Sequence, residues 1–155
     1  MIYISHRGNI NGKNPERENS PDYILEAIEK GYDVEIDVWW NNGKWFLGHD
    51  SPTYQINFYE LVYDNKKLWL HAKNHEALRE IVKYFNYLNI YWLKFFWHQT
   101  DDFTLTSNGY IWTYPGKELT IHSICVLPET ANYSNEDLKI CYGICSDNIE
   151  KYKIL

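Results

Sequence analysis

Apolar and polar positions alternate in blocks that predict strands and helices in turn through the first half of the chain. A short apolar run at residues 2–5 predicts a buried strand, and a loop rich in glycine and asparagine follows it. Residues 19–32 carry apolar side chains at helical spacing. Ser20 and Pro21 are typical of a helix start and Gly31 is typical of a helix end, so this segment is predicted to be the first helix.

The next segment predicts a hairpin followed by a second strand and helix. Residues 33–40 and 44–50 are alternating runs separated by Asn-Asn-Gly, and Asn-Gly between such runs favours a tight turn. A loop with one helical turn, a strand and the strongest helical pattern of the chain then follow, at residues 51–67, 68–73 and 74–89.

The second half of the chain has strands but few helices. It contains four strand-like runs with short connections, at residues 90–97, 109–115, 122–128 and 140–146. Helical character is confined to two short segments, at residues 135–139 and 148–155. Alternating strands and helices favour a parallel sheet or barrel. We therefore expect one α/β domain over residues 1–155, with its helices reduced in the second half.

Charge and cysteine content limit the classes of function. A net charge of −6 and the lack of a Lys/Arg block argue against a protein that binds nucleic acid irrespective of sequence. No signal peptide is expected, and the longest apolar run, at residues 91–97, is too short for a transmembrane segment. We expect a cytoplasmic protein in which Cys125, Cys141 and Cys145 are reduced. Core packing is the favoured interpretation of these thiols, and a metal site is the alternative.

Two acidic residues lie side by side on the strand predicted at residues 33–40. Glu35 and Asp37 are two positions apart, so they project from one face while their apolar neighbours project from the other. Adjacent carboxylates in a partly buried site repel each other strongly unless a proton or a cation intervenes. Mg²⁺ and Ca²⁺ prefer such oxygen ligands. An edge strand with both carboxylates in solvent is the plainer alternative.

Basic residues recur at other predicted strand ends. His6 and Arg7 follow the first strand, His49 ends the hairpin, and His71 and Lys73 share one face of a later strand. In a parallel barrel or sheet the carboxyl ends of the strands meet at one face, where active sites form. Each residue alone is more commonly an ordinary core or surface residue, but together they predict a site that handles phosphate.

Six short motifs carry these residues in a fixed order. They are HRG at 6–8, ENS at 18–20, EID at 35–37, HD at 49–50, HAK at 71–73 and GICSD at 143–147. In this order they resemble the glycerophosphodiester phosphodiesterase family, within the wider group of phospholipase C-like phosphodiesterases. The resemblance is close over residues 3–73 and weak at the carboxyl end.

The resemblance implies a TIM-type (β/α) barrel, compact or incomplete at this length, that hydrolyses a phosphodiester to an alcohol and a phosphomonoester. The substrate it implies is a small molecule, either glycerophosphodiester-like or sugar-linked. It also implies an acid/base pair, two phosphate-binding cations and a metal site, formed respectively by His6 and His49, by Arg7 and Lys73, and by Glu35, Asp37 and His71. The family usually has an acidic ligand where this chain has His71. Two alternatives follow: Mn²⁺ and Zn²⁺ join Mg²⁺ and Ca²⁺ as candidate ions, or the ion is held only by Glu35, Asp37 and water.

Three further residues are candidates for the same site. Asn19 belongs to the ENS motif, and His98 and Asp101 follow the strand predicted at residues 90–97. The alternative function is an inactive barrel that binds a phosphorylated small molecule or a carbohydrate, which the imidazole at position 71 and the short chain both favour. The trimmed helices also leave a homo-oligomer open.

Overall fold

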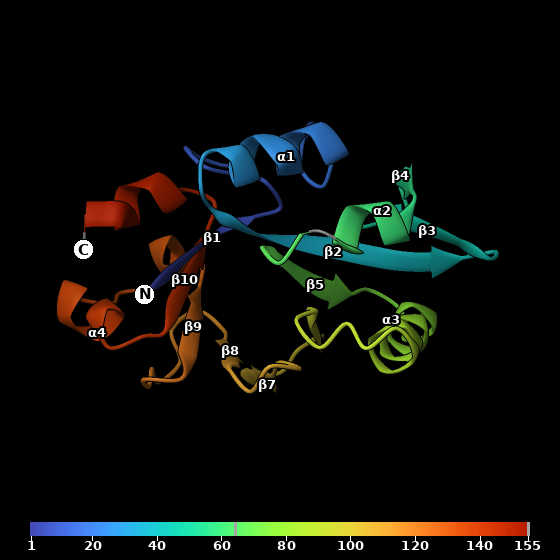
Figure 1. Ribbon diagram of the computed structural model, residues 1–155. Coiled ribbons are helices and arrows are strands. Elements are labelled where there is room, and N and C mark those ends of the chain that lie inside the picture. Colours follow the sequence, from blue (N-terminus) through green and yellow to red (C-terminus); the bar gives the residue numbers. More distant parts are fainter. Residues whose placement is uncertain (64, 155) are drawn as a thin grey trace.

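One curled sheet organises the protein, which a computed structural model describes over residues 1–63 and 65–154 (Figure 1). In these two ranges the sheet has ten strands: β1 Ile2–His6, β2 Asp33–Asn41, β3 Lys44–Leu47, β4 Tyr54–Ile56, β5 Leu68–Ala72, β6 Lys94–Trp97, β7 Phe103–Leu105, β8 Ile111–Thr113, β9 Ser123–Val126 and β10 Gly143–Ser146. The helices are α1 Pro21–Glu29, α2 Phe58–Tyr63, α3 His75–Tyr87 and α4 Asn135–Lys139, with 3-10 helices η1 Pro128–Thr130 and η2 Ile149–Ile154.

Most of the sheet is parallel. Strands β6, β5, β2, β1, β10, β9 and β8 run side by side in the same direction, and β7 closes the row as an antiparallel neighbour of β8. The β3–β4 hairpin pairs with the carboxyl-terminal part of β2. The row curls into a half-barrel, and the loop after β7 contacts β6 at the other end of the row, where Ser107 N donates to the Phe95 carbonyl at 2.9 Å. The carboxyl ends of seven parallel strands therefore face the same rim.

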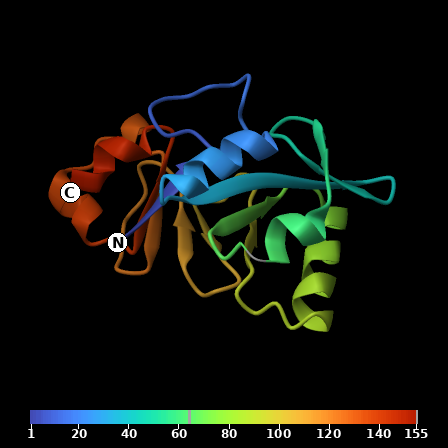
Figure 2. The same cartoon turned by 45° about the horizontal axis from the view of Figure 1, so that its top comes forward.

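Helices cover the outside of the curl unevenly (Figures 1 and 2). Helix α1 packs on β2, and α3 packs on β2, β5 and β6, whereas β1 and β10 are covered by the 3-10 helix η2. Asn74 joins α3 to the sheet, because its side chain caps the helix at Ala77 N and also pairs with the backbone of Trp40. The reduction of helices in the second half, expected from the sequence, is confirmed.

Apolar side chains fill both faces of the sheet. The larger cluster lies mainly between the sheet and its helices, and the smaller one comes chiefly from the strands β1, β5, β6, β8, β9 and β10, with Ile4, Trp69, Phe96, Trp112, Ile124, Val126 and Cys145 as its buried members. The three cysteines are unpaired and buried, which confirms the core interpretation of these thiols. Burial raises the pKa of the Cys145 thiol well above its ordinary value.

Several local predictions need correction. Residues 90–93 do not belong to a strand, because only Lys94–Trp97 pairs with β5. Strands β4 and β7 were not predicted, since three-residue antiparallel segments are too short for an alternating pattern to stand out. The final helical segment is a 3-10 helix. No helix among the described residues is long and apolar enough to cross a membrane.

The turn that carries His49 depends on Gly48, which adopts a φ of +147°. A Cβ added there would collide with the Ser51 carbonyl oxygen and lie 2.8 Å from Thr53 Oγ1. Gly43, in the β2–β3 turn, also has a positive φ but has open space around it. The two positions therefore separate backbone strain from steric collision.

We expect Gly43→Ala to lower the free energy of unfolding by about 1 kcal/mol through backbone strain alone. Gly48→Ala should cost roughly 3 kcal/mol or more, because the collision adds to the strain. Urea denaturation of the two variants measures the difference. Equal losses would contradict the tight packing of the turn at Gly48.

Candidate functional site

A pocket of about 390 Å³ opens at the rim where the parallel strands end. The described residues that line it are His6, Arg7, Glu35, His49, His71, Lys73, His98, Gln99, Trp112, Tyr114, Val126 and Leu127. Sequence motifs from β1, β2, the β3–β4 turn and β5 thus meet at one place. The convergence that was expected from the parallel arrangement is present.

Asp37 on β2 lies beneath the charged side of this pocket, in contact with several of its lining residues and with no exposed surface of its own. Its Oδ2 atom is 2.9 Å from Arg7 Nε, accepts a hydrogen bond of 2.9 Å from Asn19 Nδ2, and lies 3.2 Å from His49 Nδ1. Asn19 also accepts a bond from the backbone N–H of Asp37. The amide of Asn19 therefore holds both the main chain and the carboxylate in place, which makes Asn19 a positioning residue.

The other oxygen of Asp37 faces β5 and the residue that follows it. Oδ1 lies 3.0 Å from His71 Nδ1 and 3.3 Å from Lys73 Nζ. Burial by itself would raise the pKa of the Asp37 carboxyl. Hydrogen bonds from His49 and His71, together with the charge of Arg7, outweigh burial and hold that pKa well below its ordinary value. Asp37 is thus a buried, ionised carboxylate.

Glu35, Asp37 and His71 form a compact ligand set. One ligand atom from each lies within 4.8 Å of the others, and all three residues are buried. Glu35 Oε2 and Asp37 Oδ1 are buried without a hydrogen bond of good geometry, although Lys73 and His71 lie close to the Asp37 oxygen. Buried oxygens of this kind need a cation or a donor. The set therefore fits a divalent metal ion.

The orientation of His71 supports that fit. Its Nε2 lies 3.1 Å from the carbonyl oxygen of His98, which can only accept, so Nε2 carries a proton. This bond turns Nδ1 toward Glu35 at 3.6 Å and toward Asp37 at 3.0 Å. Metal-bound histidines characteristically donate their second ring N–H in this manner. Phe96 stacks on the ring at 5.0 Å and fixes its plane.

Two carboxylates also determine the charge of His71 when no ion is bound. Burial lowers the pKa of the His71 imidazole, but hydrogen bonds to Asp37 and Glu35 and their negative charges outweigh it and raise the pKa to about 9. A proton on Nδ1 then occupies the position that a metal ion would take. Proton and metal compete for the same nitrogen.

His6 is held from behind by the last strand of the sheet. Its Nδ1 lies 2.7 Å from Asp147 Oδ1, which directly follows β10, and its Nε2 lies 3.9 Å from Glu35 Oε2. Burial would raise the pKa of the Asp147 carboxyl, but the bond and charge of His6, the bond from Asn9 and the charge of Arg7 together outweigh burial and lower that pKa. Asn9 donates to the same Asp147 oxygen at 2.8 Å. The pair leaves Nε2 of His6 directed at the pocket.

Glu129 supports this pair and was not predicted from the sequence. Its carboxylate accepts bonds of 2.9 Å from the Ser146 hydroxyl and from the backbone N–H of Asp147. It lies in η1, after β9, so the ends of two neighbouring strands are joined behind His6. A lone glutamate in a Pro-Glu-Thr segment carries no sequence signal for such a role. The serine and aspartate of the GICSD motif were the available signal for the Asp147 contact.

Arg7 is held in place by contacts of its guanidinium group. Glu18 Oε2 accepts from Arg7 Nη1 at 3.1 Å, while the Nη2 atom lies 3.4 Å from His49 Nε2. Arg7 has a positive φ of 55°, and a Cβ on the following Gly8 would lie 2.6 Å from the ring of Tyr23. The glycine of the HRG motif is thus needed for a close approach as well as for a turn.

The three additional candidates occupy different places. Asn19 lies within the site, as described above, and His98 lines the pocket with a buried Nε2 that has no hydrogen-bond partner. Burial is the main reason that the pKa of His98 is lowered. Asp101 is exposed and does not line the pocket.

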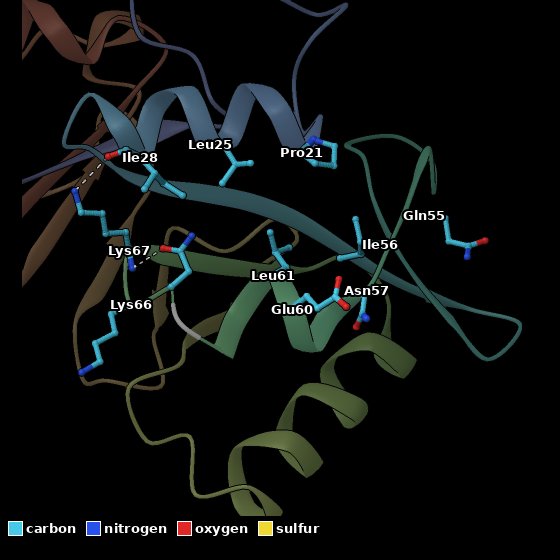
Figure 3. Close-up of a pocket in the computed structure, with 11 residues that line it drawn as sticks. Pro21, Leu25, Ile28, Gln55, Ile56, Asn57, Glu60, Leu61, Lys66 and Lys67 are labelled. Carbon is cyan, nitrogen blue, oxygen red and sulfur yellow. Dashed lines mark hydrogen bonds between the residues drawn. The ribbon is translucent and has the colours of Figure 1, made fainter.

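A larger hollow of about 800 Å³ lies elsewhere, between α1 and α2 beside β4 (Figure 3). Its walls are formed mainly by apolar side chains such as Leu25, Ile28, Ile56 and Leu61, with Lys66 and Lys67 at one end. It shares no lining residue with the charged pocket. Size alone therefore does not identify the place where the polar groups converge.

No family model, curated protein or solved structure matches the chain. The functional interpretation consequently rests on the geometry of the pocket and on the motifs.

The raised pKa of His71 predicts how the metal-free protein responds to pH. The stabilisation that protonated His71 gives to the folded state is fully present below pH 6.5, the ordinary pKa of histidine. It is lost as the pH rises through about 9, the pKa in the folded protein. We expect the free energy of unfolding to fall by roughly 3 kcal/mol over that interval. Chelator-treated protein should show this in urea denaturation, and His71→Gln should flatten the curve. An unchanged slope in that variant would contradict the assignment.

Proposed function

We propose that the protein is a metal-dependent phosphodiesterase that hydrolyses a small phosphodiester to an alcohol and a phosphomonoester. The observation that carries this proposal is the meeting of a buried Glu35–Asp37–His71 ligand set with His6 and His49 at one pocket. In this proposal the half-barrel is a compact TIM-type barrel, since seven parallel strands direct their carboxyl ends at the same rim.

The metal site would be held by Glu35, Asp37 and His71. A divalent ion there supplies positive charge for the phosphoryl oxygens and orients the reacting group. The two carboxylates suit Mg²⁺ or Ca²⁺, and the imidazole extends the range to Mn²⁺ and Zn²⁺.

Arg7 and Lys73 provide the fixed positive charge. Both line the pocket. Arg7 contacts Oδ2 of Asp37 and Lys73 contacts Oδ1, so both side chains are already ordered before a ligand arrives. Ordered cations stabilise developing negative charge without reorganising during the reaction. An anionic phosphodiester therefore has two preformed partners.

His6 and His49 suit the roles of acid and base. Asp147 holds the proton on His6 Nδ1, so Nε2 is the atom that accepts or delivers a proton toward the pocket. In neutral His49, Nε2 accepts from Arg7, which can only donate, and Nδ1 donates to Asp37. His6 thus presents Nε2 to the pocket, and His49 would use its own Nε2, which Arg7 contacts at 3.4 Å. In this proposal the two imidazoles exchange these roles during the reaction.

Turnover tests this proposal directly. We expect hydrolysis of bis-p-nitrophenyl phosphate or a glycerophosphodiester in the presence of Mg²⁺, Ca²⁺, Mn²⁺ or Zn²⁺, and its loss with a chelator. His6→Ala and His49→Ala should each lower kcat/KM by roughly 10²–10⁴, the usual contribution of one acid/base group. His122→Ala is the matched control, because His122 is exposed and does not line the pocket.

Binding without turnover under every metal would instead favour the inactive barrel that holds a phosphorylated small molecule or a carbohydrate. Activity that survives in His6→Ala, with the fold intact by circular dichroism, would contradict the proposed acid/base pair. A cytoplasmic location, the absence of nucleic-acid partners and a homo-oligomer stay predictions from the sequence.

Metal binding should release a proton from His71. At pH 7.5 the Nδ1 atom of metal-free His71 is protonated, because its pKa is raised to about 9, and an ion bound there must displace that proton. Titration of weakly buffered protein with Mn²⁺ should therefore release about one proton per site. His71→Gln should bind the ion more weakly and release none, while His122→Gln should match the wild type. Release of the same size from His71→Gln would contradict the ligand assignment.

A further inference from the structure

The two sides of the pocket differ in chemistry. Its first side, from β1, β2, the β3–β4 turn and β5, carries the charged groups described above. Its second side comes from β8 and β9 and consists of Trp112, Tyr114, Val126 and Leu127, which we call the apolar wall. His98 and Gln99 lie on the loop after β6, which contributes the remaining lining. One ligand in this pocket would meet cations on one side and apolar surface on the other.

The apolar wall continues the buried cluster of the barrel interior. Val126 and Trp112 are 5% and 4% exposed, and Leu127 packs against the same cluster while it remains half-buried. Trp112 stacks on Phe96 at 4.3 Å, which in turn stacks on His71. Tyr114 is 46% exposed, beside the His98 ring at 5.0 Å. Rigid rings thus support the wall from below.

Leu127 has an unfavourable backbone conformation for its side chain. It adopts φ 45° and ψ 53°, the left-handed region that glycine and asparagine tolerate and leucine disfavours. The conformation is fixed on both sides, since Leu127 N donates to the Cys145 carbonyl at 2.7 Å and Thr130 donates twice to the Leu127 carbonyl. Strain of this kind is characteristic of functional sites. Here it keeps an apolar side chain on the pocket surface.

We propose that the apolar wall binds the alcohol part of the substrate, and that the substrate is a phosphodiester with one apolar ester group rather than two polyol groups. This inference rests on the proposed function, because it assumes that the phosphate lies against Arg7 and Lys73. Burial of apolar surface against the wall would then add to binding in proportion to the area covered. A glycerol group has less apolar surface to bury against the wall and would gain less from it.

A pair of matched substrates tests the proposal in the wild-type protein. Hexyl methyl phosphate and 2,3-dihydroxypropyl methyl phosphate share the methyl ester and differ only in the group that the wall would contact. We expect kcat/KM for the hexyl ester to exceed that for the dihydroxypropyl ester by about tenfold or more, followed by ³¹P NMR. The reverse preference overturns the apolar wall but leaves the phosphodiesterase proposal standing. No turnover of either ester with any of the four metals overturns both.

Variants of Leu127 locate the preference. Leu127→Asn makes the wall polar while suiting the left-handed backbone, so it should lower the ratio of kcat/KM for the hexyl ester to kcat/KM for the dihydroxypropyl ester by about tenfold. Leu127→Met keeps the apolar surface and should keep the preference. Leu105→Asn is the matched control, because Leu105 is 72% exposed and away from the pocket. Tyr114→Ser changes a second, exposed position on the wall and should also lower kcat/KM for the hexyl ester.

Equal effects of Leu127→Asn and Leu105→Asn on the two esters overturn the assignment. So does a Leu127→Asn variant that keeps its thermal stability and still prefers the hexyl ester as strongly as the wild type.

Discussion

The site depends on one buried negative charge. A carboxylate with no exposed surface is costly inside a protein unless opposite charges and hydrogen bonds compensate it. Asp37 obtains that compensation from every neighbouring element, with partners on the loops after β1 and β3 and on β5 and its following turn: Arg7, Asn19, His49, His71 and Lys73. Removing the carboxylate would leave several of these groups without their partner. The contacts of Asp37 therefore both stabilise the fold and position the side chains of the candidate site.

The main chain repeats this arrangement around β2. Arg7 N donates to the Glu35 carbonyl at 3.0 Å, Gly48 N to the Asp37 carbonyl at 3.2 Å, and Lys73 N to the Val38 carbonyl at 2.9 Å. The backbone N–H groups of Arg7, of Lys73 and of the glycine before His49 are thus all bonded to β2. A central strand with neighbours on both sides is a rigid support, and rigid support is what a preorganised polar site requires. The motifs cluster because their backbones do.

Local spacing explains why part of the site was predictable. The i, i+2 pairs on β2 and β5 share a face by strand geometry alone, so Glu35 with Asp37 and His71 with Lys73 could be paired from the sequence. Contacts between elements that lie far apart in the chain leave no such trace. The bond from His6 to Asp147 spans 141 residues, and Glu129 reaches it only because β9 and β10 are neighbours. For the same reason the sheet order required the folded chain, whereas β4 and β7 were missed because they are too short to show an alternating pattern.

The trimmed second half bears on whether the pocket can be active. The charged groups come mainly from β1, β2 and β5, and helices α1 and α3 pack on this part of the sheet. Strands β8, β9 and β10 lack long helices, yet they contribute the apolar wall and the Asp147 support for His6. Apolar surface and a single carboxylate need less precise placement than a metal ligand set, because dispersion contacts are numerous and weakly directional. A chain that shortens the helices of this half alone can therefore keep the geometry of the buried Glu35–Asp37–His71 set.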